Sequence, residues 1–259
     1  MYNKFLFNVL MLSSFIVNGA DLMPSQEGRV SPVQSQEGRL SPDRKSPRLV
    51  HLNDIKKMEN LNEKHSAILR LIKYYEGGQY TKEVSTICID ALAKFSGNTS
   101  TEDSAIIFDI DETALTEYFV YKNWDFEWER SQMFEMRKQG KSEAIPGVLN
   151  LYKELKKLGY KIIFITARRE SLNRVTSDNL RNEGYEDVGV KDGDWVLCLP
   201  DNYHGVKDAE GKPLDTQWKA MTRALLSKVY TIAGSISDSA SDFKGGNAGE
   251  CIKLPNYLY

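Results

Sequence analysis

The stretch Ala105-Ile106-Ile107-Phe108-Asp109-Ile110-Asp111-Glu112-Thr113 decides how the rest of the chain is interpreted. Its first four residues form a short continuous apolar run, which is typical of a β-strand covered on both faces. Two carboxylates, Asp109 and Asp111, follow at once. Chemistry in parallel sheets lies beyond the carboxyl ends of the strands, so this loop is a candidate site. Asp-x-Asp alone is a weak signal, because acidic loops are common and a motif needs its structural context.

The sequence that follows alternates strand and helix patterns. A second apolar run, 161–165, matches the first, and between the two runs Pro146 opens a helix that Gly159 closes. The alternation predicts an α/β fold with a Rossmann-like, mainly parallel sheet flanked by helices. Two further strands and the helix before the second of them are expected at 195–199, 229–233 and about 217–227.

Helical spacing of apolar residues also precedes the first strand. It occurs in two segments, 58–75 and 84–95, which Gly77 and Gly78 separate. These segments predict a helical N-terminal extension that packs against the main domain.

The first 48 residues divide into two segments that contribute no core. Residues 1–20 place a lysine before an apolar run and end on Gly19 and Ala20, which is the layout of a secretory signal peptide. The run is shorter than the roughly 20 residues of a membrane span, so we expect cleavage and a secreted or periplasmic protein rather than a membrane anchor. Residues 21–48 hold two near copies of a segment with Ser, Gly and Pro and predict a disordered linker. Residues 49–259 are then the folded domain.

Composition excludes several classes of function. The formal charge of −2 gives no global basic field, so a nucleic acid polymer is not an expected partner. The three cysteines, Cys88, Cys198 and Cys251, are widely separated, which favours neither a disulfide scaffold nor a zinc site; all three are expected to be buried. The three histidines lie far apart and form no cluster with an adjacent arginine.

Polar side chains follow the other predicted strands as well. The second strand ends at Thr166-Ala167-Arg168, which offers a hydroxyl and a guanidinium to phosphate oxygens. The last strand leads to a loop with Asp238 and Asp242, and hard carboxylate oxygens gathered in this way suit Mg²⁺. Lys219, near the start of the preceding helix, can neutralise both a carboxylate and a phosphate.

Taken together, these features resemble the haloacid dehalogenase superfamily, in the acid phosphatase branch that includes bacterial class B enzymes and plant vegetative storage proteins. The resemblance spans about residues 103–259. It rests on a set of short motifs: Phe108 to Thr113, Ile145 to Val148, Phe164 to Arg168, Asn179-Leu180, Ser241-Asp242 and Lys253 to Tyr257.

The resemblance implies a magnesium-dependent phosphomonoesterase that forms an aspartyl-phosphate intermediate on a small phosphate ester. Asp109 would be the nucleophile, and Asp111 would protonate the leaving oxygen and later activate water. Thr166 would bind the transferring phosphoryl group, and Lys219 would hold both phosphate and nucleophile. The implied magnesium site consists of Asp109, the backbone carbonyl of Asp111, Asp238 and, in support, Asp242.

Some positions depart from the family pattern or allow two interpretations. Ser237 stands where the family commonly has Gly. Lys207 and Lys212 are alternatives to Lys219, although the family spacing favours Lys219. Arg168 either contacts phosphate or substrate or pairs on the helix that follows it, and Glu112 is expected to support the loop.

A small cap insert between the first two motifs is expected to lie over the cleft, as in this superfamily. Its aromatic side chains either stack on a nucleobase or phenyl group or fill the interface between cap and core. We expect Trp124 and Trp128 to bind substrate and to favour nucleoside monophosphates or aryl phosphates. The aromatic residues are Tyr118, Phe119, Tyr121, Trp124, Phe126 and Trp128.

Other functions stay open on the same fold. The chain could be a weakly active or inactive storage or phosphate-binding protein, or an interaction protein, because a fold alone does not confer activity. A phosphotransferase, with a hydroxyl acceptor in place of water, would use the same motifs. A carbon–halogen hydrolase is disfavoured, because it has little use for Asp111 or for a metal loop. The sequence predicts no oligomeric state.

Overall fold

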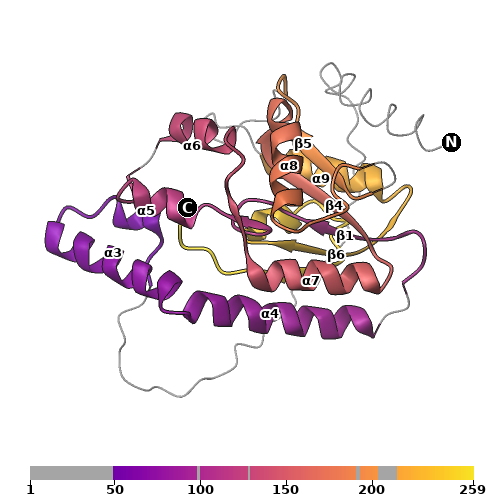
Figure 1. Cartoon of the computed structure of the whole chain (residues 1–259), viewed down its shortest axis with the longest axis horizontal. Coiled ribbons are helices and arrows are strands. Elements are labelled where there is room, and N and C mark those ends of the chain that lie inside the picture. The colour runs from indigo at the N-terminus through magenta and orange to yellow at the C-terminus, as the bar shows by residue number, and fades with distance from the viewer. Residues whose placement is uncertain (1–48, 98–99, 128, 191–192, 204–214) are drawn as a thin grey trace, which may run out of the picture. The chain divides into compact units, whose positions relative to one another are not determined.

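The computed structural model describes residues 49–97, 100–127, 129–190, 193–203 and 215–259, and these belong to one unit, Leu49–Tyr259 (Figure 1). The predicted signal peptide and linker, at 1–20 and 21–48, lie outside the described residues. Among the residues described, no helix has the length and apolar character needed to cross a membrane.

A five-stranded sheet forms the centre of the unit, in the order β5-β4-β1-β6-β7. Every neighbouring pair of strands is parallel, which confirms the predicted α/β fold. The central strand β1 is buried along its whole length, as its apolar run predicts. The strands are β1 (Ser104–Phe108), β4 (Lys161–Arg169), β5 (Trp195–Leu199), β6 (Thr231–Ser237) and β7 (Glu250–Lys253).

The two faces of the sheet are covered by different helices. Side chains alternate along a strand, so Ile106 and Phe108 of β1 join one core cluster, together with residues of α7 (Pro146–Lys157) and α8 (Asn173–Asn182). Ala105 and Ile107 point the other way and pack with Leu226 of α9 (Asp215–Leu226). Two 3₁₀ helices, η2 (Glu170–Leu172) and η3 (Ala240–Phe243), follow β4 and β6.

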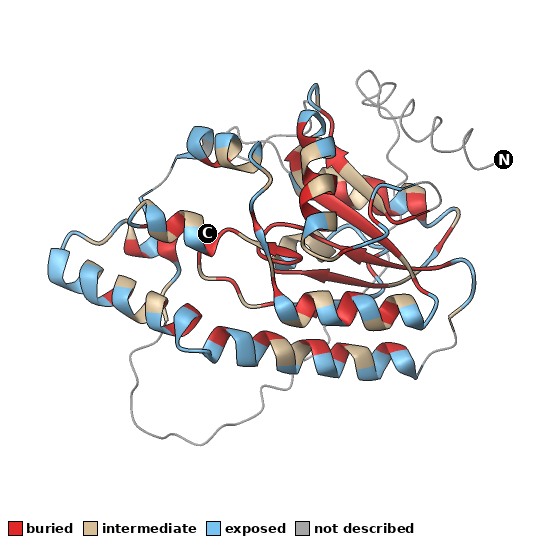
Figure 2. Cartoon of the chain, viewed as in Figure 1, coloured by how far each residue is buried: buried red, intermediate tan, exposed pale blue. Residues whose placement is uncertain are grey.

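The helical extension predicted before β1 is present and consists of α2 (Leu52–Ile55), α3 (Leu61–Glu76) and α4 (Gln79–Ser96). The chain turns between α3 and α4 at Gly78, whose φ of 81° is a left-handed conformation that glycine adopts without strain. Helix α4 lies alongside α7 (Figure 1) and its inner side chains belong to the same core as the sheet. The outer faces of both helices are exposed (Figure 2).

The predicted small cap insert leaves the sheet directly after β1. It begins and ends with two short strands, β2 (Leu115–Thr116) and β3 (Glu143–Ala144), which pair antiparallel. Between them lie α5 (Tyr118–Asn123) and α6 (Arg130–Arg137). The paired strands fix both ends of the insert beside the loop that carries Asp109 and Asp111.

One expectation about the cysteines is wrong. All three thiols are free, and Cys88 and Cys198 are buried, but Cys251 is exposed. Cys251 lies on β7, the edge strand of the sheet, where only Ile252 is buried.

Candidate active site

The carboxyl ends of β1, β4 and β6 meet at one edge of the sheet. Phe108 lies opposite Phe164 in β4 and Ile236 in β6, so the residues that follow each strand emerge side by side. The Asp109 amide donates to the carbonyl of Ile236 at 3.0 Å, which continues the ladder into the loop. The structure thus brings together Asp109, Asp111, Thr166, Arg168, Lys219, Asp238 and Asp242.

Lys219 joins two of the predicted carboxylates. Its Nζ donates to Asp109 Oδ1 at 2.7 Å and to Asp242 Oδ2 at 2.5 Å, and the whole side chain is buried. Burial lowers the pKa of an ammonium group, but the two adjacent carboxylates outweigh it and raise the pKa of Lys219. Lys219 is therefore a fixed positive charge against Asp109. The alternatives Lys207 and Lys212 lie outside the described residues.

Ser237, the departure from the family pattern, supports this arrangement. Its Oγ donates to Asp242 Oδ2 at 2.6 Å and accepts the Ser239 amide at 3.0 Å. A glycine could make neither contact, so the serine fixes the loop that carries Asp238 and Asp242.

Asp109 and Asp238 lie in surroundings that disfavour their negative charge. Burial raises the pKa of Asp109, the carboxylates of Asp242 and Asp238 raise it further, and Lys219 opposes them. Burial also raises the pKa of Asp238, although Asn256 donates to its Oδ2 at 2.7 Å. A second cation near these two carboxylates would relieve the remaining repulsion.

The donors at this point fit magnesium. They are two carboxylates, of Asp109 and Asp238, and the carbonyl of Asp111, all of them hard oxygens. Within the described ranges there is no group of three or more His, Cys, Asp or Glu side chains arranged to hold a metal. The implied site needs only two such side chains and a carbonyl, since Mg²⁺ keeps several waters.

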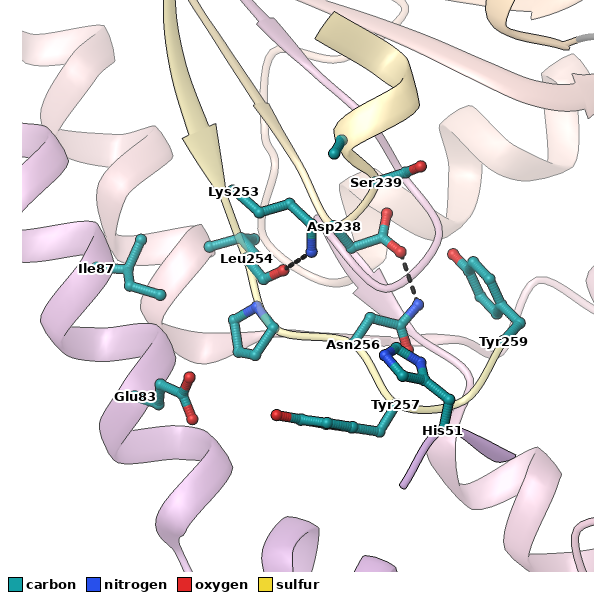
Figure 3. Close-up of a pocket in the computed structure, with 12 residues that line it drawn as sticks. His51, Glu83, Ile87, Asp238, Ser239, Lys253, Leu254, Asn256, Tyr257 and Tyr259 are labelled. Carbon is teal, nitrogen blue, oxygen red and sulfur yellow. Dashed lines mark hydrogen bonds between the residues drawn. The ribbon is translucent and has the colours of Figure 1, made fainter. Parts of the chain in front are cut away.

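Tyr259 also reaches these oxygens. Its hydroxyl donates to the carbonyl of Asp111 at 3.2 Å, and the Asp238 carboxylate lies beside it as a second acceptor. Figure 3 shows this hydroxyl turned toward Asp238. The residue as a whole is 38% exposed, so the ring reaches inward from the surface. The sequence motif at 253–257 ends two residues before Tyr259 and so does not include it.

Asp111 is held by arginines on both of its oxygens. Arg168 donates to Oδ1 through Nε at 2.9 Å and Nη2 at 2.7 Å, and Nη2 of Arg137 lies 3.2 Å from Oδ2. Burial alone would raise the pKa of Asp111, but these charges outweigh it and lower the pKa to about 2. Arg168 thus pairs with Asp111, and its Nη1 also donates to the Thr176 hydroxyl of the following helix, α8, at 3.4 Å. A direct contact between Arg168 and substrate stays a prediction.

Sequence reasoning missed Arg137 and its other partner, Glu117. Nε and Nη2 of Arg137 donate to the two oxygens of Glu117, at 2.8 and 2.9 Å. Both residues belong to the insert and approach Asp111 only through the tertiary fold. No local pattern marks either one.

Glu112 supports the loop, as the sequence suggests. Its carboxylate accepts the Glu117 amide at 2.6 Å and the Thr116 hydroxyl at 3.0 Å. Its φ of 52° is left-handed, which is uncommon for a residue with a side chain. The buried carboxylate therefore holds the turn that leads from the strand into the insert.

Thr166 is fully buried near the carboxyl end of β4. Its hydroxyl oxygen accepts the Arg168 amide at 3.1 Å, so its proton is available to another acceptor. That is the property the predicted phosphate-binding role requires.

A cavity of about 490 Å³ opens beside Asp238 (Figure 3). Its walls come from His51, from Glu83 and Ile87 of α4, and from the segment 253–259. Of the two predicted aromatic contacts, Trp124 does not line it and is half-buried at the end of α5, and Trp128 lies outside the described residues.

Other aromatic residues of the insert fill an interface. Tyr118, Tyr121 and Phe126 are buried, and Tyr118 stacks on Tyr75 of α3 with ring centroids 4.6 Å apart. Phe119 is half exposed. Packing against the helical extension accounts for most of this cluster, while the substrate roles of Trp124 and Trp128 stay predictions.

Comparison with known proteins identifies the family of the chain. A family model described as HAD superfamily, subfamily IIIB (acid phosphatase) matches residues 46–259. The stem 28 kDa glycoprotein of Glycine max is 30% identical over 195 residues, which is 72% of this chain and 72% of the relative. Acid phosphatase 1 of Solanum lycopersicum is 28% identical over 194 residues, covering 72% of this chain and 71% of the relative.

Two further matches are a plant storage protein and a solved structure. Vegetative storage protein 1 of Arabidopsis thaliana is 30% identical over 158 residues, 59% of this chain and 54% of the relative. The class C acid phosphatase from Bacillus anthracis superposes with a TM-score of 0.59 at 20% identity, covering 73% of this chain and 82% of that one. The structural match concerns the fold.

Proposed function

Because the chain belongs to subfamily IIIB of the HAD superfamily, the acid phosphatases, we propose that it is a magnesium-dependent phosphomonoesterase that works through an aspartyl-phosphate intermediate. The family supports a phosphatase, and such enzymes typically depend on a divalent metal. The observation that carries the proposal is the bond from Lys219 to Asp109 at 2.7 Å, at the strand edge where Asp111 and Thr166 also lie.

The residues divide the reaction into two steps. In the first, an oxygen of Asp109 bonds to phosphorus, the bond to the leaving oxygen breaks, and Asp111 gives that oxygen a proton. In the second, Asp111 takes a proton from water as the water oxygen bonds to phosphorus and Asp109 is released. Two arginines hold Asp111 ionised in the resting site, which is the form that the second step uses. For the first step Asp111 has to take up a proton, which a phosphate ester that binds as its monoanion supplies.

Positive charge supports both steps, because phosphoryl transfer is catalysed mainly by positioning and by neutralising oxygens. Lys219 neutralises Asp109 and the incoming phosphate, and the Thr166 hydroxyl donates to a phosphoryl oxygen. Magnesium, held by Asp109, the Asp111 carbonyl and Asp238, would supply the remaining charge.

The test is turnover of a panel of phosphate esters, with and without magnesium. We expect activity that a chelator removes and added magnesium restores. Asp109→Asn keeps the shape but cannot form an acyl phosphate, so it should abolish turnover with the fold intact. Activity above a few per cent of wild type in this variant contradicts the mechanism. Unchanged magnesium dependence in Asp238→Asn removes Asp238 from the metal site.

A storage or phosphate-binding protein with weak or no activity is the second candidate. Relatives named as vegetative storage proteins favour it. Phosphate binding without turnover of any ester in the panel would support this candidate. Transfer of phosphate to an added sugar or nucleoside hydroxyl would instead identify a phosphotransferase.

We also propose that the protein is exported, on the pattern of residues 1–20. The intact mass of the protein secreted by its host decides this point. Loss of the first residues supports a cleaved signal, whereas a chain that retains Met1 supports an anchor.

A further inference from the structure

The last residue of α6, Arg137, is fixed by the side chain of Glu117. Two of its nitrogens donate to the two oxygens of that carboxylate, at 2.8 and 2.9 Å. This paired geometry sets the plane of the guanidinium as well as its position. The same Nη2 lies 3.2 Å from Asp111 Oδ2, so the orientation of Arg137 is passed on to Asp111.

The two oxygens of Asp111 depend on different parts of the molecule. Oδ1 is held by Arg168, which belongs to β4 of the central sheet. Oδ2 is held by Arg137, which belongs to the insert. The carboxylate is locked about its own axis only while the insert keeps its present position.

Glu117 balances the charge of the two arginines that hold Asp111 in the protein interior. It is itself buried, and Nη2 of Arg168 also approaches its Oε1, at 3.4 Å. Two arginines and two carboxylates then form a cluster with no net charge. A buried cluster is tolerable when each charge has a partner, whereas an unpaired buried charge is costly.

We propose that Arg137 is a positioning residue of the active site, which turns Asp111 toward the leaving oxygen and makes proton transfer depend on the placement of the insert. The inference rests on the phosphatase function proposed above. A general acid works only when its proton lies within hydrogen-bond reach of the atom that receives it. A small rotation of Asp111 would break that alignment while leaving the nucleophile and Lys219 untouched.

Two other roles for Arg137 predict different results. If it contacts the substrate phosphate, its loss weakens all esters alike, because every ester carries the same phosphate. If it only packs the insert, its loss lowers stability and also affects all esters alike. Positioning of the acid predicts a loss that depends on the leaving group.

The experiment compares an alkyl phosphate with p-nitrophenyl phosphate in wild type and in Arg137→Met. An alkoxide needs a proton to leave, whereas p-nitrophenolate leaves without one. The measured quantity is kcat/KM, because it reports the steps up to cleavage of the ester bond and not the later attack of water. We expect kcat/KM for the alkyl ester to fall about tenfold more than that for the aryl ester, a part of the 10²–10⁴-fold typical of general acid catalysis.

Two further variants complete the comparison. Arg137→Lys keeps the charge but not the paired geometry, so it should fall between wild type and Arg137→Met for the alkyl ester. Lys138→Ala is the matched control, since Lys138 follows directly and its Nζ contacts Glu135 and the Phe134 ring, both on α6 and away from Asp111; both esters should be unaffected. Equal losses for the two esters in Arg137→Met, or no loss for either, overturn the proposal.

A measurement without turnover separates this proposal from the phosphatase function. Thermal unfolding of Arg137→Met, Asp111→Asn and the double variant forms a double-mutant cycle. If Arg137 holds Asp111, the second substitution shifts Tm less than it does alone. Additive shifts contradict the contact. Wild type that hydrolyses no ester rejects the phosphatase, and the cycle alone then decides whether Arg137 holds Asp111.

Discussion

At the scale of single residues, the Tyr259 hydroxyl lies against the same oxygen atoms that are proposed to bind the metal ion. The hydroxyl donates to the carbonyl of Asp111, and the Asp238 carboxylate lies beside it as a second acceptor. Both oxygens belong to the donor set proposed for magnesium. The phenol and the ion therefore compete for the negative charge of these oxygens.

Tyr259→Phe should accordingly bind magnesium more tightly. The ring keeps its packing, but the competing donor is gone and both oxygens are available to the ion. Each tenfold gain in affinity corresponds to about 1.4 kcal/mol, and loss of one modest hydrogen bond predicts a change of that order or less. Titration calorimetry with magnesium in the absence of substrate measures it. Weaker binding in the variant contradicts this prediction, because the hydroxyl would then be holding the carbonyl in place for the ion.

Residues of the candidate site differ in how far the sequence reveals them. Asp109, Asp111 and Thr166 directly follow apolar runs, so strand pattern and motif together locate them. Arg137 lies in the insert, on a helix without a strong apolar stripe, and Glu117 precedes α5. Their contacts with Asp111 arise only when the insert folds back onto the sheet edge. The spacing of residues along the sequence does not indicate such contacts.

At the scale of elements, burial decides which strands the sequence predicts. Strands β1 and β4 are buried on both faces and therefore appear as apolar runs. The sequence does not predict strand β7, because β7 lies at the sheet edge and consists of Glu-Cys-Ile-Lys, with only Ile252 buried. The two-residue strands β2 and β3 are too short to give any periodic signal.

The contact between α4 and the sheet gives a test of this packing. Gly234 of β6 faces Phe95 of α4, and a Cβ at Gly234 would lie 2.4 Å from the ring and 2.9 Å from the carbonyl oxygen of Glu250. The buried ring and the backbone both resist movement, so Gly234→Ala should lower the free energy of unfolding by about 1–3 kcal/mol, the usual effect of overpacking. Denaturant unfolding measures the change.

Gly97→Ala is the matched control for this substitution. A Cβ there would meet only the carbonyl oxygens of Lys94 and Ala93, at 3.7 and 3.8 Å, which is ordinary contact. A change within about 0.5 kcal/mol is expected, as for most surface substitutions. Gly234→Ala with wild-type stability would show that α4 does not pack on β6 as described.

The insert gives a second test at this scale, concerning substrate choice. If Trp124 and Trp128 contact the substrate, wild type should prefer nucleoside monophosphates and aryl phosphates to glycerol phosphate, because stacking is worth about 1–3 kcal/mol per base. Trp124→Ala and Trp128→Ala should each reduce that preference, measured as a ratio of kcat/KM values. Equal turnover of all esters, or variants that keep the same preference, would assign these rings to packing, as for Tyr118.

At the scale of the whole molecule, the helical extension belongs to the same core as the sheet. Leu52 and Ile55 of α2 and Leu71 of α3 are fully buried in the cluster that includes Phe108 of β1. The Leu52 amide donates to the carbonyl of Tyr257 at 2.8 Å, which joins the first helix to the segment beside the cavity. The folded unit therefore needs its helices from α2 onward.

Removal of residues 1–48 should leave the unfolding temperature and ester turnover unchanged, because every contact described for the site lies within 49–259. Removal of residues 1–78 also takes away α2 and α3 and should leave no cooperative transition. Each large buried side chain lost costs about 2–5 kcal/mol, and several such losses exceed the 5–15 kcal/mol that stabilises a typical domain. Circular dichroism during heating measures both variants. Reduced stability in the shorter truncation would mean that residues 1–48 contribute to the core, whereas a cooperative transition in the longer one would make the helical extension dispensable.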